Sequence, residues 1–458
     1  MGDFYRLSGA PSRWRVRLAQ AKTSALLSLL FLAVYGGCNW IASLRSDVGF
    51  WFFEWERNIP FVPLMIVPYM SIDLLFAAAP FLCRDEQERR TFARRVTAAV
   101  WVAGAFFLLV PLRFAFPRPV VSGWLGGIYR FLHGFDQPFN LFPSLHITLR
   151  TILAETYARH TKGVIRWSIQ IWFSLIGFST LLTYQHHIVD VIGGFILATF
   201  CCYFIREPIQ KSPVTKNLRA GLYYGLGCGS VFALSIYMGP WGSLLLWPAA
   251  ALALAALAYF GSGPAIFRKE RGRLPLSAQL VLAPFLLGQY LSLLYYRNRS
   301  RAWDEVVPGV WIGRKLGRFE AEQALGQGIT AVLDLTAEFS EAAPFLAGNY
   351  LNLPVLDLTA PTQTQLEKAA AFIQEHSVHG KVYVHCKIGY SRSAAAIGAY
   401  LLKSGFAGTA EEAVELIRRA RPSLIVRPEA LDALKRFQTS FSPQPRQAIT
   451  KRGYLKVG

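Results

Sequence analysis

The sequence predicts two parts, a polytopic α-helical membrane domain of about nine spans and a C-terminal α/β domain. Of the 458 residues, 53% are hydrophobic, and they are unevenly distributed. Up to about residue 300 the chain is a series of apolar runs of roughly 20 residues, each long enough to cross a hydrocarbon core ~30 Å thick. The remaining stretch, about 150 residues of mixed composition, is long enough for one domain with its own core.

The apolar runs set the expected spans and domain boundaries. The spans are 23–44, 60–83, 96–116, 141–158, 165–185, 187–205, 220–238, 243–261 and 277–296. We therefore expect a membrane domain over 1–300, including extra spans over 220–296, an α/β domain over 301–445 and a basic tail over 446–458.

Charge predicts the orientation of these spans. Arginines and lysines follow the even-numbered spans, as at Arg89, Arg90 and Arg94, and are sparse in most of the alternate loops. By the positive-inside rule the N-terminus is cytoplasmic, and strict alternation places the C-terminal domain in the periplasm of a bacterial inner membrane. Arginines 297, 299 and 301 oppose this, and the domain is cytoplasmic if residues 277–296 lie flat or re-enter.

The net charge of +20 is of the kind that nucleic-acid-binding proteins carry. The basic residues lie mainly in short loops beside apolar runs, and no nucleic-acid motif is present. Membrane and phospholipid headgroups are therefore the expected partners. The sequence does not predict an oligomeric state.

Strand and helix patterns alternate in the C-terminal part. "ITAVLDL" (329–335) and "KVYVHC" (381–386) predict buried strands, and the segments 361–376 and 410–422 have helical apolar spacing. Pro361 suits the first turn of one helix, and Thr409 suits the cap of the other.

The stretch "VHCKIGYSRS" (384–393) combines a thiol, a glycine and an arginine within one loop. A strand before it and a helix after it would turn successive backbone N–H groups inward, at a helix N-terminus where anions bind. The positive electrostatic potential of these N–H groups favours the thiolate of Cys386. The guanidinium fork of Arg392 can hold two phosphate oxygens. Gly389 allows the tight curl. The expected phosphate-binding residues of the loop are Lys387, Ile388, Gly389, Tyr390 and Ser391.

This Cys-x5-Arg loop resembles that of the cysteine-dependent protein tyrosine phosphatase superfamily, with dual-specificity spacing. The resemblance covers about residues 304–440, and "VVPGVWIG" and "VYVHCKIGYSRSAA" are most similar to the branch that dephosphorylates phosphatidylglycerophosphate. It implies that Cys386 is the nucleophile, Arg392 the phosphate clamp and Asp357 the general acid. Ser393 would ease departure of the thiolate, and His385 would hold the loop electrostatics. Glu338 resembles an acidic residue of the lipid branch, with a solvated glutamate as the alternative.

Three polar clusters lie at predicted outer ends of spans, where ionisable residues are costly and point to function. They are "LRFAFPRP" (112–119), "FPSLHIT" (142–148) and "YQHHIVDVIGG" (184–194). His186 and Asp190 are four residues apart, so the carboxylate can orient the imidazole, and His146 opens another span at similar depth. Two histidines and a carboxylate suit phosphoryl transfer through a phosphohistidine. We expect no chemistry from the neighbouring His187.

These clusters resemble the type 2 phosphatidic acid phosphatase superfamily over about residues 60–206, which implies a six-helix core. The resemblance makes His186 the nucleophile, Asp190 its orienting partner and His146 the acid. It makes Arg113, Arg118 and Ser144 phosphate ligands. Two family positions differ, with Pro111 in place of a lysine and Thr180 in place of an arginine. Similar losses in headgroup-transferring relatives favour transfer to an alcohol over hydrolysis.

Both halves therefore predict an integral membrane lipid-phosphate enzyme that needs no metal or cofactor, because arginines and N–H groups supply the electrophilic assistance. One alternative is a membrane-tethered phosphatase acting on phosphotyrosine or phosphoserine. Another is a non-enzymatic scaffold or phosphoinositide-binding module.

Overall fold

The computed structural model describes residues 13–135, 137–207 and 214–440. It divides the chain into two compact units, Met1–Ile209 and Gln210–Gly458. The boundary expected near residue 300 marks the change in composition, whereas the packing boundary lies near residue 210. The expected basic tail over 446–458 lies outside the described residues.

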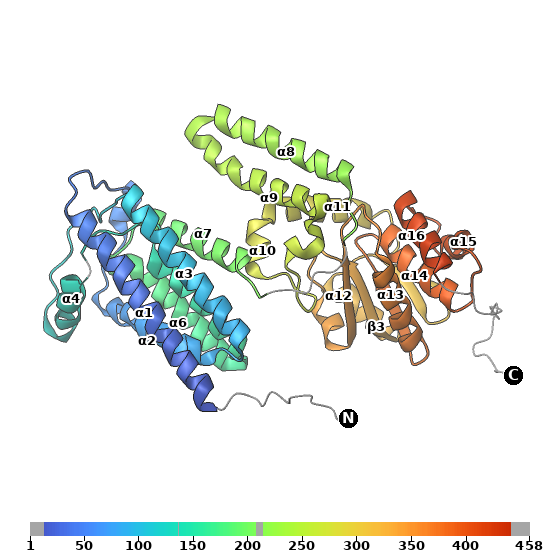
Figure 1. Ribbon diagram of the computed structural model, residues 1–458, viewed down its shortest axis with the longest axis horizontal. Coiled ribbons are helices and arrows are strands. Elements are labelled where there is room, and N and C mark those ends of the chain that lie inside the picture. Colours follow the sequence, from blue (N-terminus) through green and yellow to red (C-terminus); the bar gives the residue numbers. More distant parts are fainter. Residues whose placement is uncertain (1–12, 136, 208–213, 441–458) are drawn as a thin grey trace, which may run out of the picture. The chain divides into compact units, whose positions relative to one another are not determined.

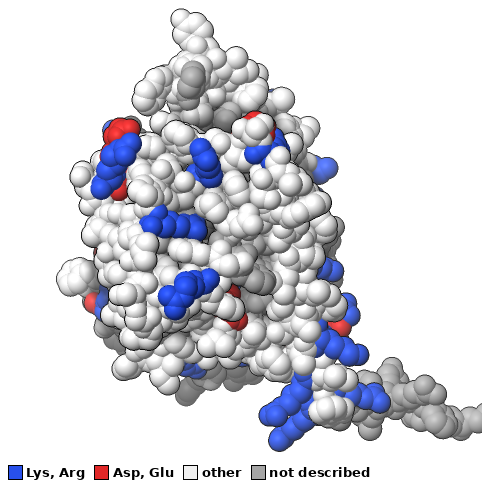
Figure 2. All heavy atoms as spheres, turned by 90° about the vertical axis from the view of Figure 1, so that its left-hand side faces the viewer, with Lys and Arg blue, Asp and Glu red and all other residues white. Residues whose placement is uncertain are grey.

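The N-terminal unit is helical (Figure 1). Its helices are α1 (Arg13–Ser43), η1 (Glu54–Asn58), η2 (Pro63–Met65), α2 (Ile66–Leu82), α3 (Glu86–Leu109), α4 (Gly123–Phe135), α5 (Leu145–His160), α6 (Gly163–Leu182) and α7 (Ile188–Phe204). Large apolar side chains cover its outside, and Figure 2 shows one face on which charged groups are few. On α6 alone Val164, Ile165 and Trp167 are 80, 66 and 72% exposed, as expected for a surface solvated by lipid.

Six described helices are long and apolar enough to cross a membrane. They begin at Arg13, Pro63, Glu86, Gly163, Leu218 and Trp241. Among the shorter ones, α7 is apolar but has 17 residues, and α5 has 16. The expected span 277–296 is broken at Leu282 into two helices. The number of nine spans stays a prediction.

The C-terminal unit contains a five-stranded mixed sheet in the order β1-β2-β5-β3-β4. The strands are β1 (Trp303–Val307), β2 (Val310–Gly313), β3 (Ile329–Thr336), β4 (Asn349–Val355) and β5 (Lys381–His385). Only the β1–β2 pair is antiparallel. The two strands predicted from the apolar runs are β3 and β5, the adjacent central strands, which explains their continuous hydrophobicity.

Helices cover both faces of this sheet. They are α12 (Arg318–Gly326), η6 (Ala343–Ala347), α13 (Gln363–Ser377), α14 (Ser391–Lys403), α15 (Ala410–Ala420) and α16 (Pro428–Thr439). On β5, Val382 and Val384 join the core formed with α13 to α16, and Tyr383 between them joins the core with α12 and η6. Thr409 caps α15 as predicted. The placement of Pro361 in a first turn is wrong, because Thr362 is the cap of α13 and Pro361 precedes it.

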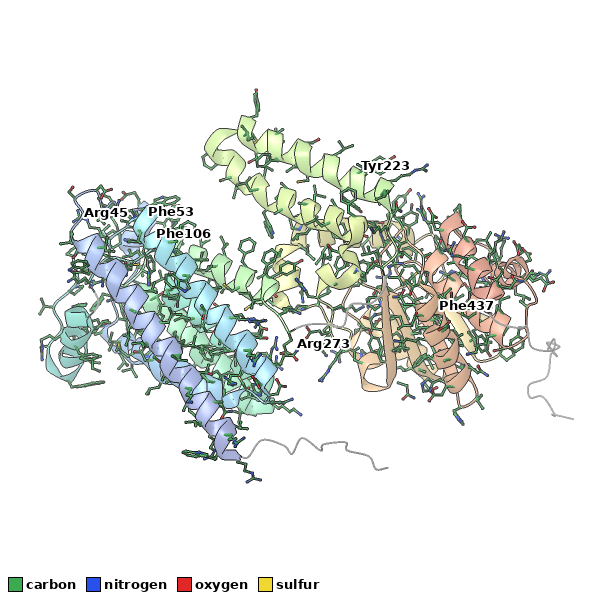
Figure 3. The ribbon with its side chains drawn as sticks, in the orientation of Figure 1. Arg45, Phe53, Phe106, Tyr223, Arg273 and Phe437 are labelled. Atoms are coloured by element: carbon green, nitrogen blue, oxygen red, sulfur yellow. The ribbon has the colours of Figure 1, made fainter. Side chains whose placement is uncertain are left out.

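A second group of helices packs within the same unit. It comprises α8 (Leu218–Tyr237), η3 (Gly239–Leu245), α9 (Leu246–Leu257), η4 (Ala258–Ser262), η5 (Gly263–Phe267), α10 (Leu276–Val281) and α11 (Ala283–Arg297). We call α8 to α11 the helical extension. Helices α8 and α9 form a hairpin with exposed outer side chains, such as that of Tyr223, which is 75% exposed and is labelled in Figure 3.

Candidate active site

The candidate active site is the loop between β5 and α14. The strand ends at His385 and the helix begins at Ser391, so Cys386 to Tyr390 form the turn at the helix N-terminus. Gly389 has φ of +77°, and a Cβ there would lie 2.5 Å from the Gly313 carbonyl oxygen. Glycine is therefore required both by conformation and by the close approach of β2. The loop is also held from behind, because buried Arg421 donates to the Ile388 carbonyl at 3.0 Å.

The loop favours the thiolate form of Cys386. Burial, the largest single influence, would raise the pKa of the thiol, and the positive charge of Arg392 opposes it. The Ser393 hydroxyl and the backbone N–H groups of Ser393 and Tyr390 also favour the thiolate, and together with Arg392 they outweigh burial, so the pKa is lowered. Cys386 thus has the electrostatics of a nucleophile.

Arg392 is held by a buried carboxylate. Its two terminal nitrogens lie 3.1 and 2.8 Å from the Glu338 oxygens, and both side chains are 3% exposed. Nη1 also donates to the Val355 carbonyl at 2.8 Å. Burial would lower the pKa of Arg392, but Glu338, Asp357 and Cys386 raise it well above its usual value. Glu338 is therefore the residue that orients the arginine fork, and it is not solvated.

Asp357 lies at the mouth of the loop, just after β4. Its Oδ1 is 3.2 Å from Arg392 Nη2 and its Oδ2 is 3.2 Å from Lys387 Nζ. Burial would raise the pKa of Asp357, but the charges of Arg392 and Lys387 outweigh burial and lower it. In the free enzyme the carboxylate is therefore ionised. A phosphate dianion that engages Arg392 offsets one of these cations and favours the protonated acid.

His385 sits behind the loop in a buried charge cluster with Lys269, Lys315, Asp334 and Glu341. Its Nε2 is 2.7 Å from Glu341, and its Nδ1 is 3.3 Å from the Cys386 carbonyl oxygen. Burial lowers the pKa of His385, but Glu341 and Asp334 raise it above its usual value. The histidine can thus hold a positive charge directly beneath the loop.

Three members of this cluster are the one group of described residues close enough together to hold a metal ion, namely Asp334, Glu341 and His385. Lysines already occupy the cation positions. Lys269 Nζ is 2.5 Å from Asp334 and Lys315 Nζ is 2.9 Å from Glu341. The cluster is charge-paired and does not fit a metal.

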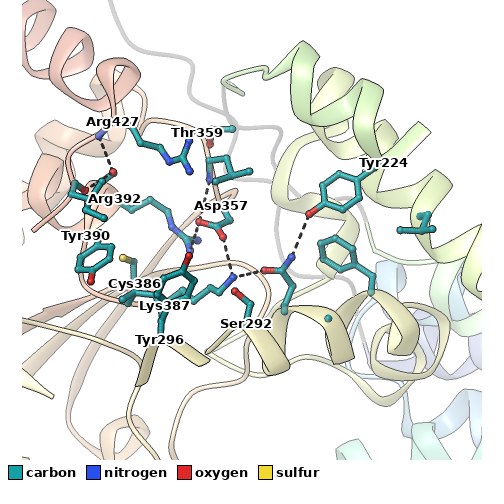
Figure 4. Close-up of a pocket in the computed structure, with 18 of the residues that line it drawn as sticks. Tyr224, Ser292, Tyr296, Asp357, Thr359, Cys386, Lys387, Tyr390, Arg392 and Arg427 are labelled. Carbon is teal, nitrogen blue, oxygen red and sulfur yellow. Dashed lines mark hydrogen bonds and ion pairs between the residues drawn. The ribbon is translucent and has the colours of Figure 1, made fainter. Parts of the chain in front are cut away.

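A cavity of about 560 Å³ opens above Cys386 (Figure 4). On one side are Cys386, Lys387, Arg392 and Asp357, and on the other are residues of the helical extension. Those are Tyr224 on α8, Leu252 on α9 and, on α11, Pro284, Phe285, Gly288, Gln289, Ser292 and Tyr296. The phosphate loop therefore opens onto a wall of largely apolar helices.

The second predicted site lies in the N-terminal unit. His146 and His186 line one cavity of about 300 Å³, otherwise mostly apolar, together with Asp73 of α2. His186 Nδ1 is 3.6 Å from fully buried Asp190, whose carboxylate also accepts the His187 N–H at 2.8 Å. His146 stacks on Tyr69 with 4.2 Å between the ring centres. The structure brings the predicted histidine pair together and places the carboxylate beside one of them.

The predicted phosphate ligands of this unit do not line the described cavity. Ser144 uses its hydroxyl to accept the Ile147 N–H as the cap of α5, at 3.2 Å. Arg118 donates to Gln185 at 3.1 Å, and Arg113 makes a backbone hydrogen bond to Gly49 at 2.9 Å. Their roles as phosphate ligands stay predictions.

His187 has a structural role. Its Nδ1 is 2.9 Å from buried Glu56, and its Nε2 accepts the Ala115 N–H at 3.1 Å. Both ring nitrogens are engaged, in agreement with the expectation that it takes no part in the chemistry.

Sequence reasoning missed several residues of these sites. Asp73 had a usable signal, because a carboxylate inside an apolar run is rare. Glu56 and Gln289 had none, since each becomes important only through a partner about 100 or more residues away.

Comparison with known proteins supports both assignments. Residues 310–440 match the family model of the dual specificity phosphatase catalytic domain, and residues 61–204 match that of the PAP2 superfamily. The chain thus carries a domain of each family, which confirms the two resemblances predicted from the motifs.

Individual relatives match the C-terminal part. The mouse phosphatidylglycerophosphatase and protein-tyrosine phosphatase 1 is 40% identical over 94 residues, 20% of this chain and 48% of the relative. The Arabidopsis thaliana phosphatidylglycerophosphate phosphatase PTPMT2 is 26% identical over 167 residues, 34% of this chain and 73% of the relative. The chain thus spans about half the length of the first of these. A crystal structure of PTPMT1 in complex with PI(5)P aligns with 31% of this chain and 96% of its own, at 25% identity and a TM-score of 0.29.

Proposed function

We propose that this protein is a membrane-embedded lipid-phosphate enzyme whose C-terminal domain hydrolyses a phosphate monoester on a phospholipid headgroup. The observation that carries the proposal is the composition of the Cys386 cavity. One side offers a thiolate, an arginine fork and a carboxylate, and the other is built from apolar helices of the extension. A substrate that satisfies both sides has a terminal phosphate close to apolar chains.

The chemistry follows from the loop. The Cys386 thiolate attacks phosphorus, the bond from phosphorus to the alcohol oxygen breaks, and protonated Asp357 donates its proton to the departing oxygen. Water then attacks the cysteinyl-phosphate and returns a proton to Asp357. Phosphate leaves and the thiolate is restored. Arg392 and the loop N–H groups stabilise the charge on the non-bridging oxygens in both steps.

For the N-terminal domain we propose phosphohistidine chemistry at His186, with Asp190 orienting the imidazole and His146 protonating the leaving group. The apolar cavity that holds both histidines supports a lipid as donor. The replacement of two phosphate-binding positions by Pro111 and Thr180 favours transfer of a headgroup to an alcohol over hydrolysis. Such a transfer can produce a lipid with a terminal phosphomonoester, from which the Cys386 site then removes the phosphate.

A second candidate function is a membrane-tethered protein phosphatase, which the dual-specificity family match also allows. In that case the membrane domain serves as an anchor or sensor. The two candidates differ in substrate, and one assay separates them.

The test is phosphate release by the full-length protein in detergent. Phosphatidylglycerophosphate, phosphatidic acid and phosphatidylinositol phosphate are offered beside a phosphotyrosine peptide. Wild type is compared with Cys386→Ser and His186→Ala, and Cys228→Ser on α8 is the matched thiol control. We expect release from a lipid that is lost in Cys386→Ser alone, and a second lipid product lost in His186→Ala alone. Turnover confined to the peptide would overturn the lipid assignment.

A further inference from the structure

We infer that the helical extension positions the general acid, through Gln289 on α11 and Asn217 at the start of α8. This inference rests on the proposed cysteinyl-phosphate chemistry with Asp357 as acid, and goes beyond it by assigning catalytic support to helices outside the phosphatase domain. Both are positioning residues, because neither touches the reacting atoms.

Gln289 reaches the acid through Lys387. Its side-chain oxygen accepts from Lys387 Nζ at 2.9 Å, and the same ammonium group lies 3.2 Å from Asp357. The Gln289 amide is in turn 3.5 Å from the Tyr224 hydroxyl on α8. Gln289 is 9% exposed and Lys387 is 6% exposed, so water does not readily replace these contacts. Figure 4 shows the continuous chain of interactions from α8 to Asp357.

The consequence concerns the strength of the pair between Lys387 and Asp357. With Gln289 present, the ammonium divides its hydrogen bonds between a neutral acceptor and the carboxylate. When Gln289 is replaced by a residue without an acceptor, the buried Lys387 ammonium keeps only the Asp357 carboxylate as a partner among the described side chains. The ion pair between Lys387 and Asp357 then becomes stronger. A carboxylate held more tightly as an anion is a poorer proton donor.

Asn217 holds the backbone that carries the acid. Its amide nitrogen donates to the Leu358 carbonyl at 2.8 Å, and the neighbouring Thr215 hydroxyl donates to the Ala360 carbonyl at 2.7 Å. Leu358 has φ of +60°, a conformation that a leucine rarely adopts and that surrounding contacts must maintain. Because Leu358 follows Asp357 directly, these two hydrogen bonds help to fix the direction of the acid.

The same Asn217 side chain caps α8. Its oxygen accepts the Ala220 N–H at 3.0 Å. Aspartate keeps this capping oxygen and loses the donor, so Asn217→Asp separates the loop contact from helix stability. At position 289, methionine removes the acceptor at nearly constant volume, and glutamate restores it.

The experiment compares two soluble substrates with different needs for a general acid, using full-length protein in detergent. 4-Nitrophenyl phosphate has a good leaving group and phenyl phosphate a poor one. We expect Gln289→Met and Asn217→Asp to lower kcat/KM on phenyl phosphate about 10-fold and to change kcat/KM on 4-nitrophenyl phosphate less than about 2-fold, because kcat/KM reports formation of the cysteinyl-phosphate, the step in which Asp357 acts as the acid. Gln289→Glu is expected to restore turnover of phenyl phosphate. Gln279→Met on α10 is the matched control.

An equal fall on both substrates would overturn the inference, because it is what a purely structural role predicts. No fall on either would do the same. Neither substrate is a lipid, so the inference can fail while the lipid assignment holds. Conversely, if the wild-type protein hydrolyses none of the lipids, the two aryl phosphate esters still test the positioning role.

Discussion

Replacing Lys269 with methionine would remove the cation that links the helical extension to the phosphatase sheet. Lys269 follows η5, and its Nζ lies 2.5 Å from Asp334, 2.9 Å from the Thr336 carbonyl and 3.0 Å from the Thr336 hydroxyl. The lysine side chain is 2% exposed and that of Asp334 is fully buried. The substitution therefore leaves a buried carboxylate without its nearest counter-charge.

The magnitude follows from what Asp334 retains. Breaking a buried ion pair by removing one partner costs about 3–5 kcal/mol. Asp334 keeps hydrogen bonds from Tyr350 and Thr336, each at 2.7 Å, and His385 lies 3.8 Å away, so we expect the lower end, about 3 kcal/mol. For a unit of about 250 residues this corresponds to a fall in Tm of about 6–12 °C.

The assay is the thermal midpoint of the C-terminal unit in the full-length protein, followed by calorimetry and by loss of aryl phosphatase activity after heating. Arg273→Met is the matched control, because Arg273 belongs to the same loop and is exposed (Figure 3). A double variant with Asp334→Asn should recover part of the loss. A shift in Lys269→Met no larger than that of Arg273→Met would refute the reasoning.

Three further predictions concern the loop and the cluster beneath it. Because the pKa of Cys386 is lowered, iodoacetamide should alkylate it well below the usual thiol pKa of about 8.5, and Arg392→Met should raise the pH that is required. Glu338→Gln should lower kcat/KM by about 100-fold through misplacement of the arginine, seen in steady-state kinetics, whereas a loss under about 3-fold would contradict that role. The pKa of His385 is raised in the fold, so its stabilising contribution is complete below about pH 6.5 and lost as pH rises through the folded pKa. Tm should therefore fall with rising pH, and less so in His385→Gln.

The sequence was a good guide wherever local pattern and chemistry coincide. The loop from Cys386 to Arg392 is contiguous, so its thiol, glycine and arginine could be recognised together, and the structure places the thiol and the arginine on one cavity. Glu338 could be noticed in sequence but not assigned, because only the fold shows that it meets Arg392 from 54 residues away.

The helical extension shows where sequence reasoning stops. Hydropathy groups residues 220–296 with the membrane domain, because composition reports the solvent that a helix faces. Composition does not report the partner that a helix packs on. That partner is chosen by a few buried polar atoms, such as the Lys269 ammonium and the Asn217 amide. Both residues lie in polar segments between the apolar runs, where nothing in the sequence indicates the distant group that each one contacts.

These contacts make the helical extension a structural part of the C-terminal enzyme. A tethered phosphatase needs only a linker between anchor and enzyme, and its catalytic groups would be satisfied within its own domain. Here the extension supplies partners to Lys387, to the loop after Asp357 and to the charge cluster under His385. Buried polar groups of the active site therefore depend on helices whose outer surface is apolar. We propose that such an enzyme is assembled only where those helices have a suitable solvent, which would couple catalysis to the membrane and favour a substrate that resides there.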